Sequence, residues 1–398
     1  MIYYDITYAD ETFDVEKCRE SAQSGYAPAQ YNYAVCYSRG IKIGQDLKQA
    51  AYWYEKAAEQ GNVTAQGILG NLYFYGNGAD RNLKQAVYWY EKAAKQGDEI
   101  AQYNLGNSYE FGEGVEQDFV QAVYWYQKAA EQGNAPAQTA LGCCYYNGEG
   151  VEEDSQQAVY WYRKAAAQGD PEGQRFLGKC YASGDGVEED SQQAAYWYTK
   201  AAEQGDADGQ YYLGKCYARG NGVTQDLGRA AYWYQKSVEQ GNANAQRELG
   251  FCYFHGEGIE KNLEQAVMWY TKAAVQGDCH SQAILGLCYQ EGMGVKADLS
   301  TAIQLHTKAA QRGDPIAQIN LALCYMNGTG VAQDDQQAFY WLYKAAVWGD
   351  VDAQCYVGFD YATGTGVEQD MEQAAYWYRK AAGQGSQNAI DALRQLGL

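Results

Sequence analysis

A tryptophan recurs every 36 residues along most of this 398-residue chain. A repeat of that length is a single supersecondary unit, which buries its apolar face against neighbouring units. The period therefore predicts a solenoid rather than the two or three globular domains that the length alone would suggest. Ten units run from about Ala27 to Gly385, and their tryptophans are Trp53, Trp89, Trp125, Trp161, Trp197, Trp233, Trp269, Trp341 and Trp377, with Leu305 at the one substituted position.

Each unit carries the start and stop signals of two helices. A glycine that can end a helix recurs at eleven equivalent positions from Gly25 to Gly385, and Asp or Asn follows it in nine cases, as a cap for the next helix. A second Asp or Asn follows a turn such as "GEGV", with Gln three places later in eight of ten units. This pattern favours a second helix. We call the two helices of each unit helix A and helix B.

The unit "AQYNLGNSYEFGEGVEQDFVQAVYWYQKAAEQG", from Ala101 to Gly133, resembles the Sel1-like repeats, which are relatives of the tetratricopeptide repeats. The resemblance covers about nine tenths of the chain. It implies an all-α fold, a right-handed α-solenoid superhelix of ten 36-residue helix-turn-helix repeats whose A helices line the concave face. It also implies a role as a scaffold or adaptor in protein complexes. We expect an N-terminal segment and capping helix in residues 1–26, repeats in 27–385 and a C-terminal capping helix in 386–398.

The charge of the chain excludes several classes of partner. The net charge is −20 and the pI is near 4.6, whereas a protein that binds nucleic acid or an anionic membrane needs a basic surface. No apolar run approaches the roughly 18 residues of a membrane span, and the first residues lack a basic segment followed by an apolar one. We expect a cytoplasmic monomer, with export by a route without a cleavable signal as the alternative.

Variation between the units points to a binding surface on helix A. A helical wheel places Leu105 in the core seam, together with a Gln that all ten units share, and places residues 103, 107 and 110 opposite it. Duplicated units share one packing problem, so they differ where packing does not dictate the residue. The three variable positions form a band with a basic middle and an apolar end. We predict that a partner peptide or helix binds there, to Arg175, Lys179, Tyr211, Lys215, Arg247, Phe251, Phe254, Leu287, Leu323, Met326 and Phe359.

Two alternatives to this concave site stay open. The variation can reflect drift on a tolerant surface, with curvature burying part of the band. A convex surface on helix B is the other alternative, because the wheel turns Tyr126 into the core, leaves Trp125 at its edge and points Tyr124 outward. Lys128 stands four residues on, within cation–π reach, and the lysine recurs in every unit. We favour duplication and stacking between repeats as the origin of this Tyr/Lys ladder.

Catalysis finds little support in the sequence. The only histidines are His255, His280 and His306, and no nucleophile elbow, zinc-protease or phosphate-loop motif occurs. Resemblance to cysteine-rich relatives suggests a β-lactam hydrolase as the alternative, but no "SxxK" occurs. We therefore predict that the chain is not an enzyme and uses no cofactor.

The cysteines predict neither disulfides nor a metal site. Seven of the eleven occupy one position of helix A, and packed helices lie about 8–10 Å apart, beyond the roughly 7 Å that a disulfide spans. We expect reduced, packed thiols. Cys279, His280 and His306 share one aberrant unit, but zinc needs three or four ligands, so we interpret that unit as a local change in groove shape.

Overall fold

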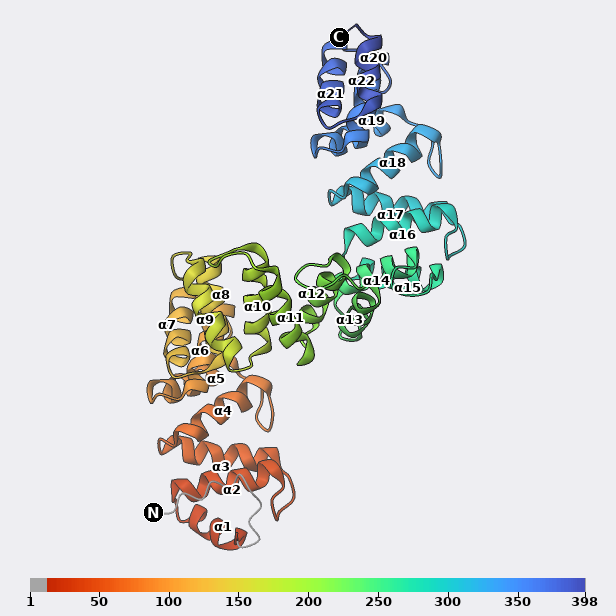
Figure 1. The fold of residues 1–398 in the computed structure, drawn as a ribbon. Coiled ribbons are helices and arrows are strands. Elements are labelled where there is room, and N and C mark those ends of the chain that lie inside the picture. The colour runs from red at the N-terminus through yellow and green to blue at the C-terminus, as the bar shows by residue number, and fades with distance from the viewer. Residues whose placement is uncertain (1–12, 398) are drawn as a thin grey trace. The chain divides into compact units, whose positions relative to one another are not determined.

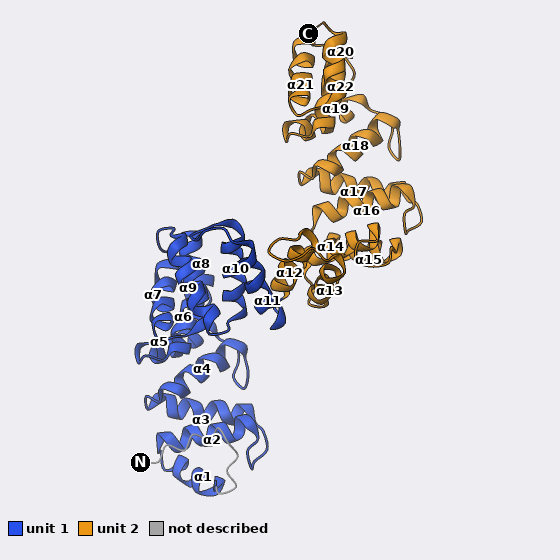
Figure 2. Cartoon of the chain, viewed as in Figure 1, with its two compact units in different colours: residues 1–206 blue, residues 207–398 orange. Residues whose placement is uncertain are grey.

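The computed structural model describes residues 13–397 and contains twenty-two α-helices and no strand in that range (Figure 1). The chain divides into two compact units, residues 1–206 (unit 1) and residues 207–398 (unit 2), which Figure 2 shows in different colours. The helices of unit 1 are α1 (Val15–Gln23), α2 (Ala27–Arg39), α3 (Leu47–Glu59), α4 (Val63–Tyr75), α5 (Leu83–Lys95), α6 (Glu99–Phe111), α7 (Phe119–Glu131), α8 (Ala135–Asn147), α9 (Ser155–Ala167), α10 (Pro171–Ser183) and α11 (Ser191–Glu203). Those of unit 2 are α12 (Ala207–Arg219), α13 (Leu227–Glu239), α14 (Ala243–His255), α15 (Leu263–Val275), α16 (Cys279–Glu291), α17 (Leu299–Gln311), α18 (Pro315–Asn327), α19 (Asp335–Val347), α20 (Val351–Thr363), α21 (Met371–Gly383) and α22 (Gln387–Gln395).

The predicted all-helical repeat fold is confirmed. Repeat 1 begins at residue 27 and each later repeat begins 36 residues on, so the even-numbered helices α2 to α20 are the A helices and the odd-numbered α3 to α21 are the B helices. Consecutive helices pack against each other within each unit. The shorter helices α1 and α22 flank the ten repeats, and their role as caps stays a prediction.

Repeat 3 shows how the predicted sequence signals begin and end the helices. The Asp118 side chain accepts the backbone N–H of Gln121 at 3.0 Å, and Asn134 accepts that of Ala137 at 2.9 Å. Gly112 has φ 69° and Gly133 has φ 103°, the left-handed backbone that follows a helix and favours glycine. The predicted caps are thereby confirmed at helix B of repeat 3 and at helix A of repeat 4, where they fix the residue at which each helix begins.

A tyrosine of helix B packs directly on the backbone of helix A. Tyr126 and Leu105 are fully buried, and a Cβ atom placed on Gly106 would lie 2.5 Å from the Tyr126 ring. The same test places a Cβ on Gly142 2.6 Å from Tyr162. In these two repeats the close approach of the tyrosine ring leaves no room for a Cβ atom, whereas repeats 1 and 9 carry the small residues Ala34 and Ala322 at this position.

The shared glutamine of helix A joins three consecutive helices. Gln102 donates its Nε2 to the carbonyl of Ala94 in the preceding B helix at 3.0 Å, and its Oε1 accepts the Nε2 of Gln132, just past the following B helix, at 2.7 Å. We call this pair of hydrogen bonds the glutamine staple. Its Gln–Gln bond recurs in eight repeats, and the exceptions are repeats 8 and 9, where Arg312 and Trp348 stand in place of the second glutamine.

Candidate protein-binding surfaces

The first variable position of helix A forms a joint between repeats. Thr139 donates to Asp170, the cap of the next A helix, at 2.7 Å, and Arg247 reaches Asp278 in the same way at 2.8 Å. Arg175 likewise lies 3.3 Å from Asp206. Each contact joins a residue to the aspartate 31 positions later. In repeats 4 and 7 that aspartate caps the next helix A, so the contact ties one helix A to the start of the next.

This joint corrects part of the predicted binding band. The helical wheel turned the position away from the core, but Tyr211 is only 6% exposed and packs among core residues of repeat 6. Arg175 and Arg247 are half-buried and ion-paired, the first also with Glu172 at 2.9 Å and the second with Glu248 at 3.1 Å. The wheel treats one isolated helix and therefore misses the neighbouring A helix.

The ion pair at Arg247 has an electrostatic effect on its partner. Burial alone would raise the pKa of Asp278, but hydrogen bonds from Ser281 and the positive charge of Arg247 hold it below the usual range. The carboxylate therefore stays charged and caps its helix. Burial and the charge of Arg219 lower the pKa of Lys215, which lies half-buried beside the Tyr211 ring.

The second variable position differs between the units. In repeats 2 and 3 it carries Asn71 and Asn107, which accept hydrogen bonds from the buried hydroxyls of Tyr90 and Tyr126 at 2.7 and 2.6 Å. Lys179 occupies it in repeat 5 and is exposed. Repeats 7 to 10, all in unit 2, instead carry the unit 2 apolar row: Phe251, Leu287, Leu323 and Phe359.

The unit 2 apolar row is partly open to solvent. Phe251 is 41% exposed and Phe359 is 50% exposed, while Leu287 and Leu323 are half-buried. Phe254 and Met326, from the third variable position, are half-buried and pack against core clusters of their own repeats. The two phenylalanines are therefore the most accessible apolar groups of the predicted band.

The outward tyrosines of helix B form a second regular surface. They are between 45 and 54% exposed in the eight repeats that have them, as predicted. Lys128 lies 5.8 Å from the Tyr124 ring and Lys92 lies 4.6 Å from the Tyr88 ring, so the predicted cation–π contacts are confirmed there. The Tyr124 ring also meets Trp125 edge-on at 4.9 Å. These contacts within the helix account for the ladder without a partner.

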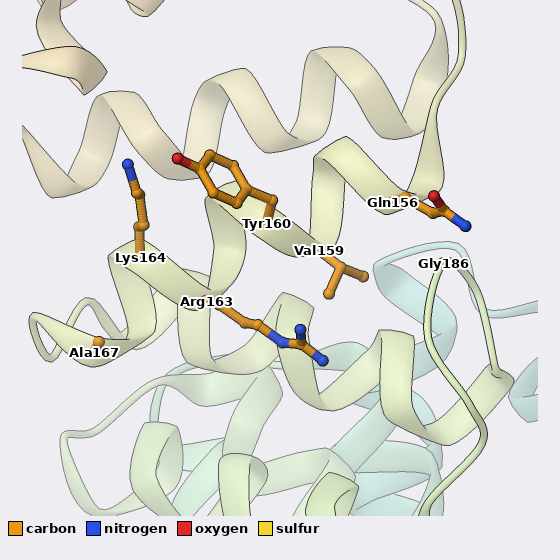
Figure 3. A pocket seen from close by; sticks show the side chains of 7 residues that line it. All are labelled: Gln156, Val159, Tyr160, Arg163, Lys164, Ala167 and Gly186. Carbon is orange, nitrogen blue, oxygen red and sulfur yellow. The ribbon is translucent and has the colours of Figure 1, made fainter.

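An open hollow of about 510 Å³ lies along α9 of repeat 4 (Figure 3). Its lining residues come from α9 and from one loop glycine of repeat 5: Gln156, Val159, Tyr160, Arg163, Lys164, Ala167 and Gly186. Tyr160 and Lys164 point to one side of the helix, and the Arg163 guanidinium points to the other. Sequence reasoning missed this hollow. A signal was present, because Arg163 and Ala167 stand at positions where repeat 3 has Gln and Glu.

Repeat 9 ends with a surface that sequence reasoning also missed. Trp348 is 77% exposed at the end of α19, beside the exposed Val347. The sequence signal for this surface was the tryptophan itself, because most repeats have glutamine at the Trp348 position. Trp348 cannot complete the glutamine staple, and the Gln318 Oε1 has no hydrogen-bond partner among the described residues.

The cysteines and histidines of repeat 8 do not converge. All eleven cysteines are free, and the seven at the shared position that fall in repeats 1 and 4 to 9 are buried, so packed thiols are confirmed. His280 Nδ1 lies 3.6 Å from the cap Asp314, whereas His306 is fully buried in the core. Within residues 13–397 no three His, Cys, Asp or Glu residues are placed to hold a metal ion. None of the described helices has the length and apolar character needed to cross a bilayer.

Comparisons with known proteins identify the repeat. The Sel1 repeat matches ten times, at residues 27–62, 63–98, 100–134, 135–170, 171–206, 207–242, 243–278, 279–314, 315–346 and 351–386. A protective antigen of uropathogenic Escherichia coli strains that displays an SLR fold is similar, with 39% identity and a TM-score of 0.84, over 96% of this chain and 83% of that one. A Sel1 repeat protein from Oxalobacter formigenes has 32% identity and a TM-score of 0.59, over 82% of this chain and 93% of that one.

No curated protein matches the chain. Sel1 repeat proteins generally serve as scaffolds for protein interactions and are typically not enzymes. The ten matched repeats cover most of the chain, and the two solved structures are similar over more than four fifths of it. The chain therefore belongs to the Sel1 repeat family.

Proposed function

We propose that this protein is a non-enzymatic scaffold that binds an apolar segment of a partner protein on the unit 2 apolar row. The observation that carries the proposal is the repetition of an apolar side chain at one position of four consecutive A helices, with Phe251 and Phe359 about half exposed. In unit 1 the same position holds Asn71, Asn107 and Lys179 in three of the five repeats, besides Val35 and Cys143, so the fold itself does not demand an apolar group there. Contiguous exposed apolar groups favour a contact surface.

The proposal narrows the predicted concave band. Arg175 pairs with Asp206, Arg247 pairs with the cap Asp278, and Tyr211 is buried. Lys179 and Lys215, at the second variable position of repeats 5 and 6, remain part of the proposed surface. We propose that they add polar contacts next to the apolar contacts and that the row supplies most of the binding free energy, because apolar burial contributes roughly 25 cal/mol per Å².

A substitution taken from the protein itself tests this surface. The variant F251N/L287N/L323N/F359N gives unit 2 the asparagine that repeats 2 and 3 carry. The matched control Y232Q/Y340Q/Y376Q alters the outward tyrosines of unit 2 to the residue of repeat 8, Gln304. Circular dichroism melting establishes that both variants fold, and a pull-down with quantitative mass spectrometry compares the partners that each retains.

Three outcomes separate the hypotheses. Partners lost by the asparagine variant and kept by the tyrosine control support the row. Equal recovery by wild type and the asparagine variant overturns it, and loss confined to the tyrosine variant moves the site to the outer ladder. A nitrocefin assay addresses the enzyme alternative, since measurable turnover would contradict a purely scaffolding role.

A further inference from the structure

Repeat 4 differs from the other repeats in charge at the hollow along α9. Arg163 and Ala167 replace the Gln127 and Glu131 of repeat 3, one turn apart on the same face of helix B. Repeat 10 has a similar pair, but Glu372 stands there in place of Gln156. Repeat 4 is thus the one repeat whose helix B combines Arg and a small neutral residue at these two positions with an uncharged residue at the Gln156 position.

The missing carboxylate changes what the ladder lysine can do. In repeats 1 and 6 this lysine pairs with a glutamate three residues on, Lys56 with Glu59 at 3.3 Å and Lys236 with Glu239 at 3.2 Å. Ala167 stands at that place in repeat 4. Lys164 lies over the Tyr160 and Trp161 rings instead, at 4.7 and 4.9 Å. Neither Arg163 nor Lys164 forms an ion pair with any residue in the range 13–397.

The arginine is nevertheless held in place. Arg163 donates one guanidinium N–H to the hydroxyl of Tyr181, in α10, at 3.1 Å, and lies over that ring at 5.8 Å. Among the described residues no other hydrogen bond to this guanidinium occurs, so several of its five N–H groups face the hollow or solvent. A fixed guanidinium loses less side-chain entropy when it binds a carboxylate.

We propose that this hollow binds an acidic segment of a partner protein. A Glu or Asp side chain bonds to Arg163, a second carboxylate contacts Lys164 on the opposite side of the helix, and an adjoining apolar side chain rests on the exposed Ala167. The volume of about 510 Å³ accommodates a few side chains, and the hollow is open, so a continuous chain can cross it without ending there. The positive charges of Arg163 and Lys164 favour carboxylate side chains over neutral ones, because a hydrogen bond between ionised groups is stronger than a neutral one.

The partner is a different protein rather than a second copy. This chain carries a net charge of −20, so two copies repel each other over the distance at which they would meet. A partner that is neutral or basic overall and presents a local acidic segment avoids this repulsion. The hollow lies on helix B, apart from the A-helix row described above, so the two proposals fail or succeed independently.

Peptide display tests the site with a defined probe. Phage that carry random dodecapeptides, with the peptide C-terminus joined to the coat protein, are selected on the full-length protein and counter-selected on R163Q/A167E. This variant copies repeat 3 at two exposed positions, and circular dichroism melting checks its fold. We expect enriched peptides to contain Asp or Glu next to an apolar residue. A synthetic amidated copy should bind R163Q/A167E about tenfold more weakly by fluorescence anisotropy.

A transplant makes the test reciprocal. Adding Q127R/E131A to the R163Q/A167E protein moves the charge pattern to repeat 3, which already has Lys128 and Tyr124, and should restore binding of the same peptide. The proposal is overturned if no peptide is enriched against R163Q/A167E, or if the enriched peptides lack acidic residues. It is also overturned if only a library with free C-termini yields binders, because the site would then recognise a chain end.

Discussion

Repeats 3 and 8 bury different side chains at the same core position. In repeat 3 Tyr126 packs on Gly106 and its hydroxyl bonds to Asn107 at 2.6 Å. In repeat 8 the fully buried His306 packs on Gly286, and neither ring nitrogen has a hydrogen-bond partner among residues 13–397. The fold accepts the histidine, but its buried polar atoms cost free energy that the tyrosine does not.

The same two repeats differ at the glutamine staple. Gln132 completes the staple in repeat 3, whereas Arg312 in repeat 8 donates to the carbonyl of Gly277 at 2.6 Å. The Gln282 Oε1 is then left without a partner within the described chain. The comparison shows that two deviations from the repeat pattern both leave unpaired polar atoms in repeat 8.

Removal of the core side chain at the position of Tyr126 and His306 should have the largest effect on the free energy of unfolding. The size of the loss should differ between repeats 3 and 8. We expect Tyr126→Ala to lower the free energy of unfolding by about 4 kcal/mol, because a large buried aromatic leaves a cavity. His306→Ala should cost about 2 kcal/mol, since a smaller ring is lost together with its unpaired nitrogens. Urea unfolding at pH 7.5 measures both. An equal or larger loss for His306→Ala would contradict the comparison.

A buried carboxylate in repeat 10 extends the comparison to pH. Asp360 stands where repeat 3 has Ser108, and burial together with the negative charge of Asp335 raises its pKa to about 7. The unfolded chain ionises this group near pH 4, so the native state becomes less stable as pH rises from about 4 to 7. We expect Asp360→Ser to gain about 3 to 4 kcal/mol over wild type at pH 8 and much less at pH 4. The same gain at both pH values would rule out this titration as its cause.

His306 should make repeat 8 sensitive to acid. Burial lowers its pKa to about 4, while the unfolded histidine binds a proton below about pH 6.5. The unfolded state therefore binds more protons between these values, and wild type should lose about 3 kcal/mol as pH falls from 6.5 to 4. His306→Tyr, which installs the tyrosine of repeat 3, should lack this part of the loss. Parallel pH profiles of the two proteins would refute the effect.

Repair of the staple should give the smallest gain. In repeat 7 Gln276 bonds both to Gln246 at 2.8 Å and to the carbonyl of Gly241 at 2.9 Å, so a glutamine in place of Arg312 can keep the bond to the Gly277 carbonyl and also complete the staple. We expect Arg312→Gln to add about 1 kcal/mol of stability, by pairing Gln282. Trp348→Gln should do the same for Gln318 in repeat 9. If thermal melting shows no gain in either variant, the staple is not a net source of stability.

Most of the fold could be predicted from the sequence because its signals are local. The sequence of one helix or one hairpin is enough to predict the cap Asp118, the close packing at Gly106 and the outward direction of Tyr124. The joint at Arg247 could not be predicted, because it depends on how a helix meets the cap 31 residues later. The hollow at Arg163 could not be predicted for a similar reason, because its walls combine α9 with the Gly186 loop of the next repeat.

The glutamine staple has a consequence for how such a protein can change length. Each complete staple is made of the same two glutamines and one backbone carbonyl, whatever the residues on the variable positions. Insertion or deletion of one whole 36-residue repeat between two standard repeats would recreate an identical junction. The protein can therefore acquire or shed one row of surface side chains at a time, and recombination between repeats becomes a route to new partners that leaves the packing intact.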